Sequence, residues 1–278
     1  MGHPDANGEL AGASPVPVIA VASGKGGVGK TTVAVNLALG LQARGLTVGL
    51  VDADLYGPDA AHMLGLRRRK DAQHITLFSA RGSAGSRLDV ARQHGLQLAS
   101  AAFLMGEAQG LGVHAGVAQL LVRRLIADAA WEGLDCLVVD LPPGSADIQQ
   151  YVFALNGYRM HVLLVVTPQV VAHRDAHRLI AELRRHGALI IGAVENMASM
   201  SCPSCGEATE MFVPAPPEES IWAQVPRLAS IPFSARGAHD ADNGLPMLVT
   251  RAVPEQVSAY EGLAGRVADL IRDVGSSQ

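Results

Sequence analysis

The sequence has few aromatic residues, few cysteines and no long apolar run. Aromatic residues make up only 4% of the 278 residues, although hydrophobic residues make up 49%. This composition favours a core of valine, alanine and leucine, which is typical of buried parallel strands. No apolar run reaches the ~20 residues needed to cross a bilayer, and three cysteines are too few for a disulfide framework. The sequence therefore predicts a cytoplasmic protein with no membrane partner.

An excess of one charge is also absent. The formal net charge is −4, so the overall balance gives no drive toward nucleic acid or anionic membranes. A basic run at 67–70 is followed by Arg81, Arg87 and Arg92. No aromatic residues interleave with these charges, as they do on surfaces that bind single-stranded nucleic acid. We therefore expect a solvated insertion here and no nucleic-acid partner.

The length and the apolar pattern predict one large α/β domain. Residues 1–15 are rich in glycine, alanine and proline and have no apolar core, so we expect a disordered lead-in rather than a signal peptide. Residues 16–274 contain apolar runs typical of buried strands, with helical patterns between them. This order is typical of an α/β fold, a mostly parallel sheet flanked by helices on both faces. Residues 275–278 would form a short tail.

The strongest motif is a glycine-rich loop between an apolar run at 16–22 and a helical pattern at 33–41. The loop fits G-x-x-x-x-G-K-[ST], the phosphate-binding P-loop. Its glycines let backbone N–H groups turn toward a phosphate, and the helix that follows points its positive end at the same place. Lys30 is expected to reach the β- and γ-phosphates and Thr31 to bind Mg²⁺. The predicted nucleotide-binding residues of the loop are Gly24, Lys25, Gly26, Gly27, Val28, Gly29, Lys30, Thr31 and Thr32.

Carboxylates follow two later apolar runs. The first run, 46–51, leads into Asp52-Ala53-Asp54, and the second, 134–139, leads into Asp140-Leu141-Pro142-Pro143-Gly144. Open α/β sheets gather such strand ends at the edge where ligands bind. Asp140 fits the Walker B pattern, whose carboxylate holds Mg²⁺ through water. The Gly144 N–H can point at a γ-phosphate. Asp52 and Asp54 suit metal-linked handling of water, and the alternative is a capping or turn-forming pair.

Three helices follow from 3.6-residue periodicity. The helix over 117–131 would place Leu120, Leu121, Leu125 and Ile126 on one face. The helix after Thr167-Pro168 would bury Ala172, Ala176, Leu179, Ile180 and Leu183. Its His173 and His177 have metal-capable spacing, but we expect a solvated flank because no third ligand is apparent. Pro254 would open a final helix to about Val274 that packs in the core.

Two of the three cysteines form a C-x-x-C pair, Cys202 and Cys205. Two thiolates can bind one metal, but sites for soft metals usually have four ligands, and the sequence has no second pair. The pair is therefore half of a site completed by a second subunit, a redox dithiol or a vestige. Cys136 lies inside a predicted strand and is expected to be a small buried hydrophobe.

The second loop lysine, Lys25, resembles the deviant Walker A motif of the MinD, ParA and nitrogenase iron protein group. More broadly, the sequence resembles the Mrp/ApbC family of iron–sulfur cluster carrier ATPases. The blocks that carry the resemblance are 21–31, 52–58, 140–144, 167–169, 194–197, 202–206 and 242–246. One departure concerns the Trp-Arg-Gly-Pro block that many relatives carry, because this chain has Gly112-Val113-His114-Ala115-Gly116 there.

The resemblance implies a homodimer with slow ATPase activity that holds a 4Fe-4S cluster between the Cys202 and Cys205 pairs of two subunits. Its cofactors would be ATP, Mg²⁺ and the cluster, and its partners would be iron–sulfur apo-proteins and scaffold proteins. Lys25 and Lys30 would act in catalysis, with Lys25 reaching the phosphates of the other subunit. By the same analogy Asp54 orients the attacking water, Asp140 serves Mg²⁺ and Asn196 contacts adenine.

Two alternatives belong to other classes. A MinD/ParA-like positioning ATPase would pattern cargo on membrane or DNA. It predicts a basic C-terminal helix or surface and has no use for Cys202 and Cys205. A zinc-bridged dimeric ATPase keeps the cysteines but needs no iron.

Overall fold

The computed structural model describes residues 16–66, 88–103, 115–144, 147–153, 155, 158–201, 205 and 207–273. In this part of the chain nine strands form one sheet in the order β3-β4-β2-β5-β1-β6-β7-β8, and β9 also pairs with β7. The expected lead-in at 1–15, the basic run at 67–70 and the tail at 275–278 lie outside the described residues. The predicted α/β fold with a mostly parallel sheet is confirmed.

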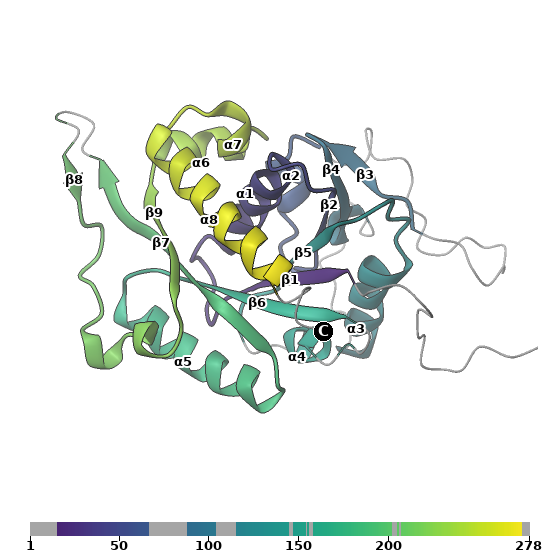
Figure 1. Ribbon diagram of the computed structural model, residues 1–278, viewed down its shortest axis with the longest axis horizontal. Helices are drawn as coiled ribbons and strands as arrows, with labels where there is room; N and C mark the ends of the chain where they lie inside the picture. The colour runs from purple at the N-terminus through teal and green to yellow at the C-terminus, as the bar shows by residue number, and fades with distance from the viewer. Residues whose placement is uncertain are drawn as a thin grey trace, which may run out of the picture.

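The strands alternate with helices along the chain (Figure 1). The strands are β1 Pro17–Ala22, β2 Val48–Asp52, β3 Ala91–Gln93, β4 Leu96–Ser100, β5 Cys136–Asp140, β6 Arg159–Val166, β7 Leu189–Ser201, β8 Ala208–Thr209 and β9 Arg227–Phe233. Only β3 and β8 pair antiparallel within the described sheet. The helices are α1 Lys30–Gln42, α2 Ala60–Met63, α3 Ala115–Arg123, α4 Asp147–Phe153, α5 Val170–Arg185, α6 Ala235–Asp242, α7 Met247–Thr250 and α8 Pro254–Asp273.

The two faces of the sheet are covered by different helices (Figure 1). Successive strand residues point to opposite faces. Thus Ile19 and Val21 of β1 join the cluster that contains α1 and α8, whereas Val18 and Ala20 join the cluster that contains α3, α4 and α5. This burial on both sides explains why the strands are continuous apolar runs rather than alternating ones.

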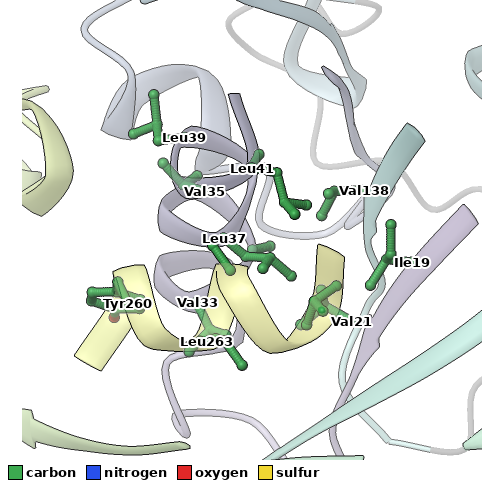
Figure 2. Packing of buried hydrophobic residues seen from close by; sticks show 14 of the residues in the cluster. Ile19, Val21, Val33, Val35, Leu37, Leu39, Leu41, Val138, Tyr260 and Leu263 are labelled. Atoms are coloured by element: carbon green, nitrogen blue, oxygen red, sulfur yellow. The ribbon is translucent and has the colours of Figure 1, made fainter. Parts of the chain in front are cut away.

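Helix α8 packs closely on α1 (Figure 2). Leu37 and Leu263 are fully buried between these helices and the sheet, and burying one leucine contributes roughly 1.5–3 kcal/mol. A Cβ atom on Gly40 would lie 2.7 Å from the Cβ of Ala264, so the glycine permits the close approach. The prediction that the C-terminal helix packs in the core is therefore confirmed.

The helix predicted over 117–131 differs from expectation. It runs as α3 and continues as a π-helix over Arg124–Asp128. Leu121, Leu125 and Ile126 are buried as predicted, but Leu120 is 53% exposed. Leu120 precedes the fully buried Val122 by two residues, about 200° around the helix, and therefore points away from the sheet. Its assignment to the inner face was wrong.

The expected solvated flank of α5 is also wrong for one of its two histidines. His173 is only 1% exposed because a 3-10 turn at Ile221–Ala223 covers it. The Ile221 N–H donates to His173 Nδ1 at 3.3 Å, and Trp222 packs edge-on against the imidazole. His177 is half-buried, with Nε2 3.0 Å from the Glu219 carbonyl oxygen. These contacts join residues more than 40 positions apart, which the helical period alone does not reveal.

This burial leads to a pH prediction. Desolvation, with contributions from His177 and Arg227, lowers the pKa of His173 from 6.5 to about 4. Between those values the unfolded chain binds a proton that the folded protein does not, so stability is lost as pH falls through this window. Relative to a His173→Asn variant, which keeps an acceptor but does not titrate, the wild type should lose about 2–3 kcal/mol between pH 7 and pH 4. Denaturant unfolding at several pH values measures this difference, and parallel curves for the two proteins would contradict it.

Candidate nucleotide-binding site

The candidate site lies where the sheet reverses its connections. Strand β1 lies between β5 and β6 in the sheet. The strands that follow β1 in sequence, β2 to β5, lie on one side of it, and the chain then crosses over β1 to place β6 on the other side. Ligands of open α/β sheets bind at such switch points, beyond the carboxyl ends of the strands. The register places Asp52 of β2 beside both Asp140 of β5 and Ser100 of β4.

The P-loop joins β1 to α1 and leaves the start of that helix open. Gly29 is the N-cap residue, with φ 80°, and no side chain caps the helix. The first turn of α1 also has no acidic residue. The N–H groups there are therefore available to an anion at the positive end of the helix. Gly24 is required by packing, because a Cβ there would lie 2.5 Å from the Asp175 carbonyl carbon of α5.

The side chain of Asn196 in β7 is hydrogen-bonded to the backbone of the P-loop. Its side-chain amide donates to the Val28 carbonyl oxygen at 2.8 Å, and the side chain is 6% exposed. A Cβ on Gly29 would overlap this amide, at 2.3 Å from Nδ2. The structure thus gives Asn196 a contact with the loop backbone that its motif did not suggest. Its contact with adenine stays a prediction.

Lys30, Thr31 and Asp140 are in direct contact. The predicted roles of Lys30 at the phosphates and of Thr31 and Asp140 at Mg²⁺ stay predictions. Lys30 Nζ lies 2.6 Å from Asp140 Oδ1, and Thr31 Oγ1 donates to Asp140 Oδ2 at 2.6 Å. Lys30 is 6% exposed and Asp140 is fully buried. Burial raises the pKa of Asp140, and the Lys30 ammonium opposes that rise. The carboxylate thus pairs with the two side chains that the P-loop pattern assigns to phosphate and Mg²⁺.

Asp52 adds a second buried carboxyl group to this centre. Its Oδ2 accepts hydrogen bonds from Ser100 Oγ at 2.9 Å and from the Ala60 N–H at 3.1 Å. Burial, reinforced by Asp140, raises the pKa of Asp52 well above its usual range. Ser100 was missed by the motif search, although it ends an apolar strand at the same edge of the sheet.

The donor set fits Mg²⁺, which prefers hard oxygen ligands. Thr31 Oγ1 and Asp140 Oδ2 provide two such oxygens on neighbouring elements. Asp52 stands beside Asp140, and no basic side chain of the described residues lies at ion-pair distance from it. No group of three or more His, Cys, Asp or Glu residues that could hold a metal occurs among the described residues. A metal at this centre would therefore also need phosphate oxygens and water, as Mg²⁺ usually does.

Asp54 lies in the turn after β2 and is partly exposed. Its Oδ1 accepts from the Tyr56 and Gly57 N–H groups, each at 3.2 Å, so one oxygen forms the turn that the alternative interpretation expected. Oδ2 has no hydrogen-bond partner among the described residues. Burial raises the pKa of Asp54, although the Lys30 charge opposes this. One oxygen can therefore hold the turn while the other faces a ligand.

The Gly144 N–H differs from expectation. In this structure it donates to the Ser23 carbonyl oxygen at 3.0 Å, rather than standing free for a γ-phosphate. Ser23 Oγ in turn donates to the Lys25 carbonyl oxygen at 2.9 Å. Lys25 itself is partly exposed, and this hydrogen bond involves only its backbone. Backbone hydrogen bonds of this kind cannot be read from the residue types of the loop.

The cysteines occupy two different environments. Cys136 is buried within β5, and burial raises the pKa of its thiol to about 12, as expected for a structural hydrophobe. Cys205 is exposed and lies between β7 and β8, beyond the paired residues Ser201 and Ala208. Figure 1 shows this hairpin at the margin of the molecule, away from β1 and β5. Cys202 lies outside the described residues.

Together, the fold and this edge of the sheet define a P-loop NTPase. A solved nucleotide-binding protein from Archaeoglobus fulgidus in complex with ADP superposes with a TM-score of 0.68 at 27% identity, covering 88% of this chain and 92% of that one. The septum site-determining protein MinD from Pyrococcus horikoshii, complexed with Mg-ADP, gives a TM-score of 0.68 at 22% identity and covers 92% and 97%. The second likeness establishes the fold alone.

Sequence comparisons give the family. The iron-sulfur cluster carrier protein of Haemophilus influenzae is 37% identical over 267 residues, which are 93% of this chain and 68% of that protein. The cytosolic Fe-S cluster assembly factor NUBP2 of Homo sapiens is 39% identical and covers 94% and 95%. The ParA family model, described as NUBPL iron-transfer P-loop NTPase, matches residues 16–268. The chain belongs to this family of iron-transfer P-loop NTPases. The predicted resemblance to iron–sulfur carriers of the MinD/ParA group is confirmed.

No helix in the described ranges is long and apolar enough to cross a bilayer.

Proposed function

We propose that the chain is an ATP-binding and ATP-hydrolysing carrier that, as a homodimer, holds a 4Fe-4S cluster and transfers it to apo-proteins. The iron–sulfur names of its relatives support the cargo. The observation that carries the proposal is the pairing, in one domain, of an open P-loop helix start with an exposed Cys205. A positioning ATPase would have no use for that thiol.

The nucleotide half follows from the contacts around Asp140. An arriving triphosphate offers Lys30 a stronger set of anionic oxygens than one carboxylate, so the Lys30 ammonium turns to the phosphates. Thr31 and Asp140 then become free to hold Mg²⁺, which supplies neutralisation of the phosphate charge when bound. The free oxygen of Asp54 orients a water molecule toward the γ-phosphate. Slow hydrolysis is consistent with a site that must first exchange these hydrogen bonds.

The cargo half depends on two thiols per chain. Thiolate, rather than thiol, binds metal, so metal binding releases the thiol proton. Cys205 is exposed and can be reached by an incoming metal, whereas Cys136 is buried within β5. Two chains related by a two-fold axis present the same surface to each other. The Cys202 and Cys205 pairs of both subunits would then supply four sulfur ligands, the usual number for a cubane cluster.

Anaerobic reconstitution tests this proposal. Reconstituted wild type should carry about four irons per dimer, whereas a zinc-bridged dimer would hold about one metal. Cys205→Ala should lose the iron and keep ATP binding, and Cys136→Ala, the matched control, should keep both. Metal analysis, the visible absorbance spectrum and the mass in solution give the readouts. Iron retained by a Cys202→Ala/Cys205→Ala double variant, or zinc alone in protein handled without oxygen, would defeat the carrier function.

A further inference from the structure

The turn after β5, residues 141–144, is fastened to the P-loop strand by backbone hydrogen bonds. The Leu141 N–H donates to the Val21 carbonyl oxygen at 3.2 Å, and the Gly144 N–H donates to the Ser23 carbonyl oxygen at 3.0 Å. The second bond joins Gly144 to Ser23, the residue directly before the first P-loop glycine, Gly24. Any ligand that takes this N–H must therefore break the Gly144 contact with Ser23 and shift the turn.

On its other side the same turn is held by a side chain of α4. Gln149 is only 1% exposed, and its Nε2 donates to the Pro142 carbonyl oxygen. Its Oε1 is buried and has no hydrogen-bond partner among the residues that the structure describes. A buried amide oxygen without a partner loses its hydration and gains nothing in return. The present arrangement of the turn therefore leaves the hydrogen bonding of Gln149 incomplete.

The neighbouring glutamine extends this connection to α5. Gln150 Nε2 donates to Glu182 Oε1, and Glu182 is 8% exposed. Helix α5 in turn meets the P-loop, since its backbone at Asp175 packs where Gly24 has no side chain. These contacts form a continuous path: the P-loop contacts the turn, the turn contacts α4, α4 contacts α5, and α5 contacts the P-loop.

We propose that Gln149 is a positioning residue that couples the turn at 141–144 to α4, so that the nucleotide state of the P-loop reaches α4 and α5. The proposal rests on the ATP hydrolysis proposed above. A charged phosphate oxygen is a stronger acceptor than the Ser23 carbonyl and draws the Gly144 N–H away. Because Gln149 is hydrogen-bonded to the Pro142 carbonyl oxygen, α4 moves with the turn. This movement brings a hydrogen-bond donor to the Oε1 atom of Gln149.

The unpartnered oxygen alone does not single out Gln149. Gln256 of α8 has the same chemistry. Its Nε2 donates to the Pro232 carbonyl oxygen at 2.7 Å, and its buried Oε1 has no partner within the described part of the chain. Its contact joins α8 to the end of β9 and has no link to the turn. Gln149 differs because its hydrogen bond is to the turn at 141–144, which also contacts the P-loop. Gln256 is therefore a matched control.

The test compares Gln149→Met with Gln256→Met in the full-length protein. Methionine nearly conserves the volume and removes both the donor and the unpartnered oxygen. The two variants should show similar, small shifts in the thermal unfolding midpoint. Gln149→Met should hydrolyse ATP with a kcat about tenfold lower and a KM within about twofold of wild type, because it weakens an arrangement reached after binding. Gln256→Met should keep both constants.

Hydrogen exchange supplies a readout that a merely structural role would not move. In the wild type, peptides covering 147–153 should exchange differently with Mg-ADP and with a non-hydrolysable Mg-ATP analogue, and Gln149→Met should abolish that difference. Wild-type protein that hydrolyses ATP, together with a Gln149→Met variant that matches it in kcat and exchange, would overturn the coupling alone. Wild-type protein without ATP binding or turnover would overturn the proposed function and this inference with it.

Discussion

Replacing Lys30 with alanine should weaken Mg-ATP binding at least about 100-fold, which corresponds to about 2.7 kcal/mol. The lysine provides the charge that faces the β- and γ-phosphates in a P-loop. The same change leaves Asp140, which is fully buried, without the ammonium that lies 2.6 Å away. Breaking a buried ion pair from one side destabilises a protein by about 3–5 kcal/mol, so thermal unfolding must be measured beside affinity.

Lys25→Ala is the informative comparison for Lys30→Ala. Lys25 is partly exposed and forms no ion pair in the described structure, so its removal should leave stability and nucleotide affinity close to wild type. If Lys25 acts across a dimer on charge that develops in the transition state, turnover should nevertheless be lost. Calorimetric binding and phosphate release distinguish the two losses. Identical phenotypes for both lysine variants would remove the argument for a role in the other subunit.

Asp54→Asn should bind Mg-ATP normally and hydrolyse it at least about 100-fold more slowly, the scale expected for a positioned general base. Asparagine keeps an oxygen that can accept from the Tyr56 and Gly57 N–H groups, so the turn should persist. Burial raises the pKa of Asp54, so a neutral side chain there should not lower stability. Single-turnover kinetics separate the chemical step from binding. Full turnover in this variant would return Asp54 to a purely turn-forming role.

Asp140→Asn is the counterpart of this variant. It removes the charge that faces both Lys30 and Thr31, so the Mg²⁺ dependence and the affinity should change together. A variant that lost turnover alone, with unchanged Mg²⁺ dependence, would contradict the Walker B assignment.

Much of the fold could be predicted because its signals are local. Strands buried on both faces appear as uninterrupted apolar runs, and β1, β2 and β5 were each predicted to within about two residues. Their carboxyl ends share one edge of a parallel sheet, so the sequence placed the P-loop and Asp140 at the same edge. It did not predict the direct contacts of Asp140 with Lys30 and Thr31. The outward direction of Leu120 did not follow, because consecutive residues lie about 100° apart on a helix and a run of leucines does not show which of them faces the sheet.

The parts of the site that were missed depend on contacts between distant segments. Ser100 reaches Asp52 across 48 residues, and Asn196 reaches Val28 across 168 residues. Neither contact has a spacing that a single sequence could reveal. The Gly144 N–H was assigned to a phosphate from its motif, whereas in this structure a backbone carbonyl, which every residue type carries, takes that hydrogen.

Strand β7 connects the P-loop with the cysteine pair. Asn196 touches the P-loop, and the strand continues from there to Ser201, directly before the first cysteine of the pair. The strand is not evenly extended over this stretch, because Met197 has φ 56° and the register with β9 shifts between Asn196 and Met200. In the proposed carrier, a change at the P-loop would therefore reach the cysteine pair through an irregular segment of β7, where a small change in backbone angle redirects the chain that follows.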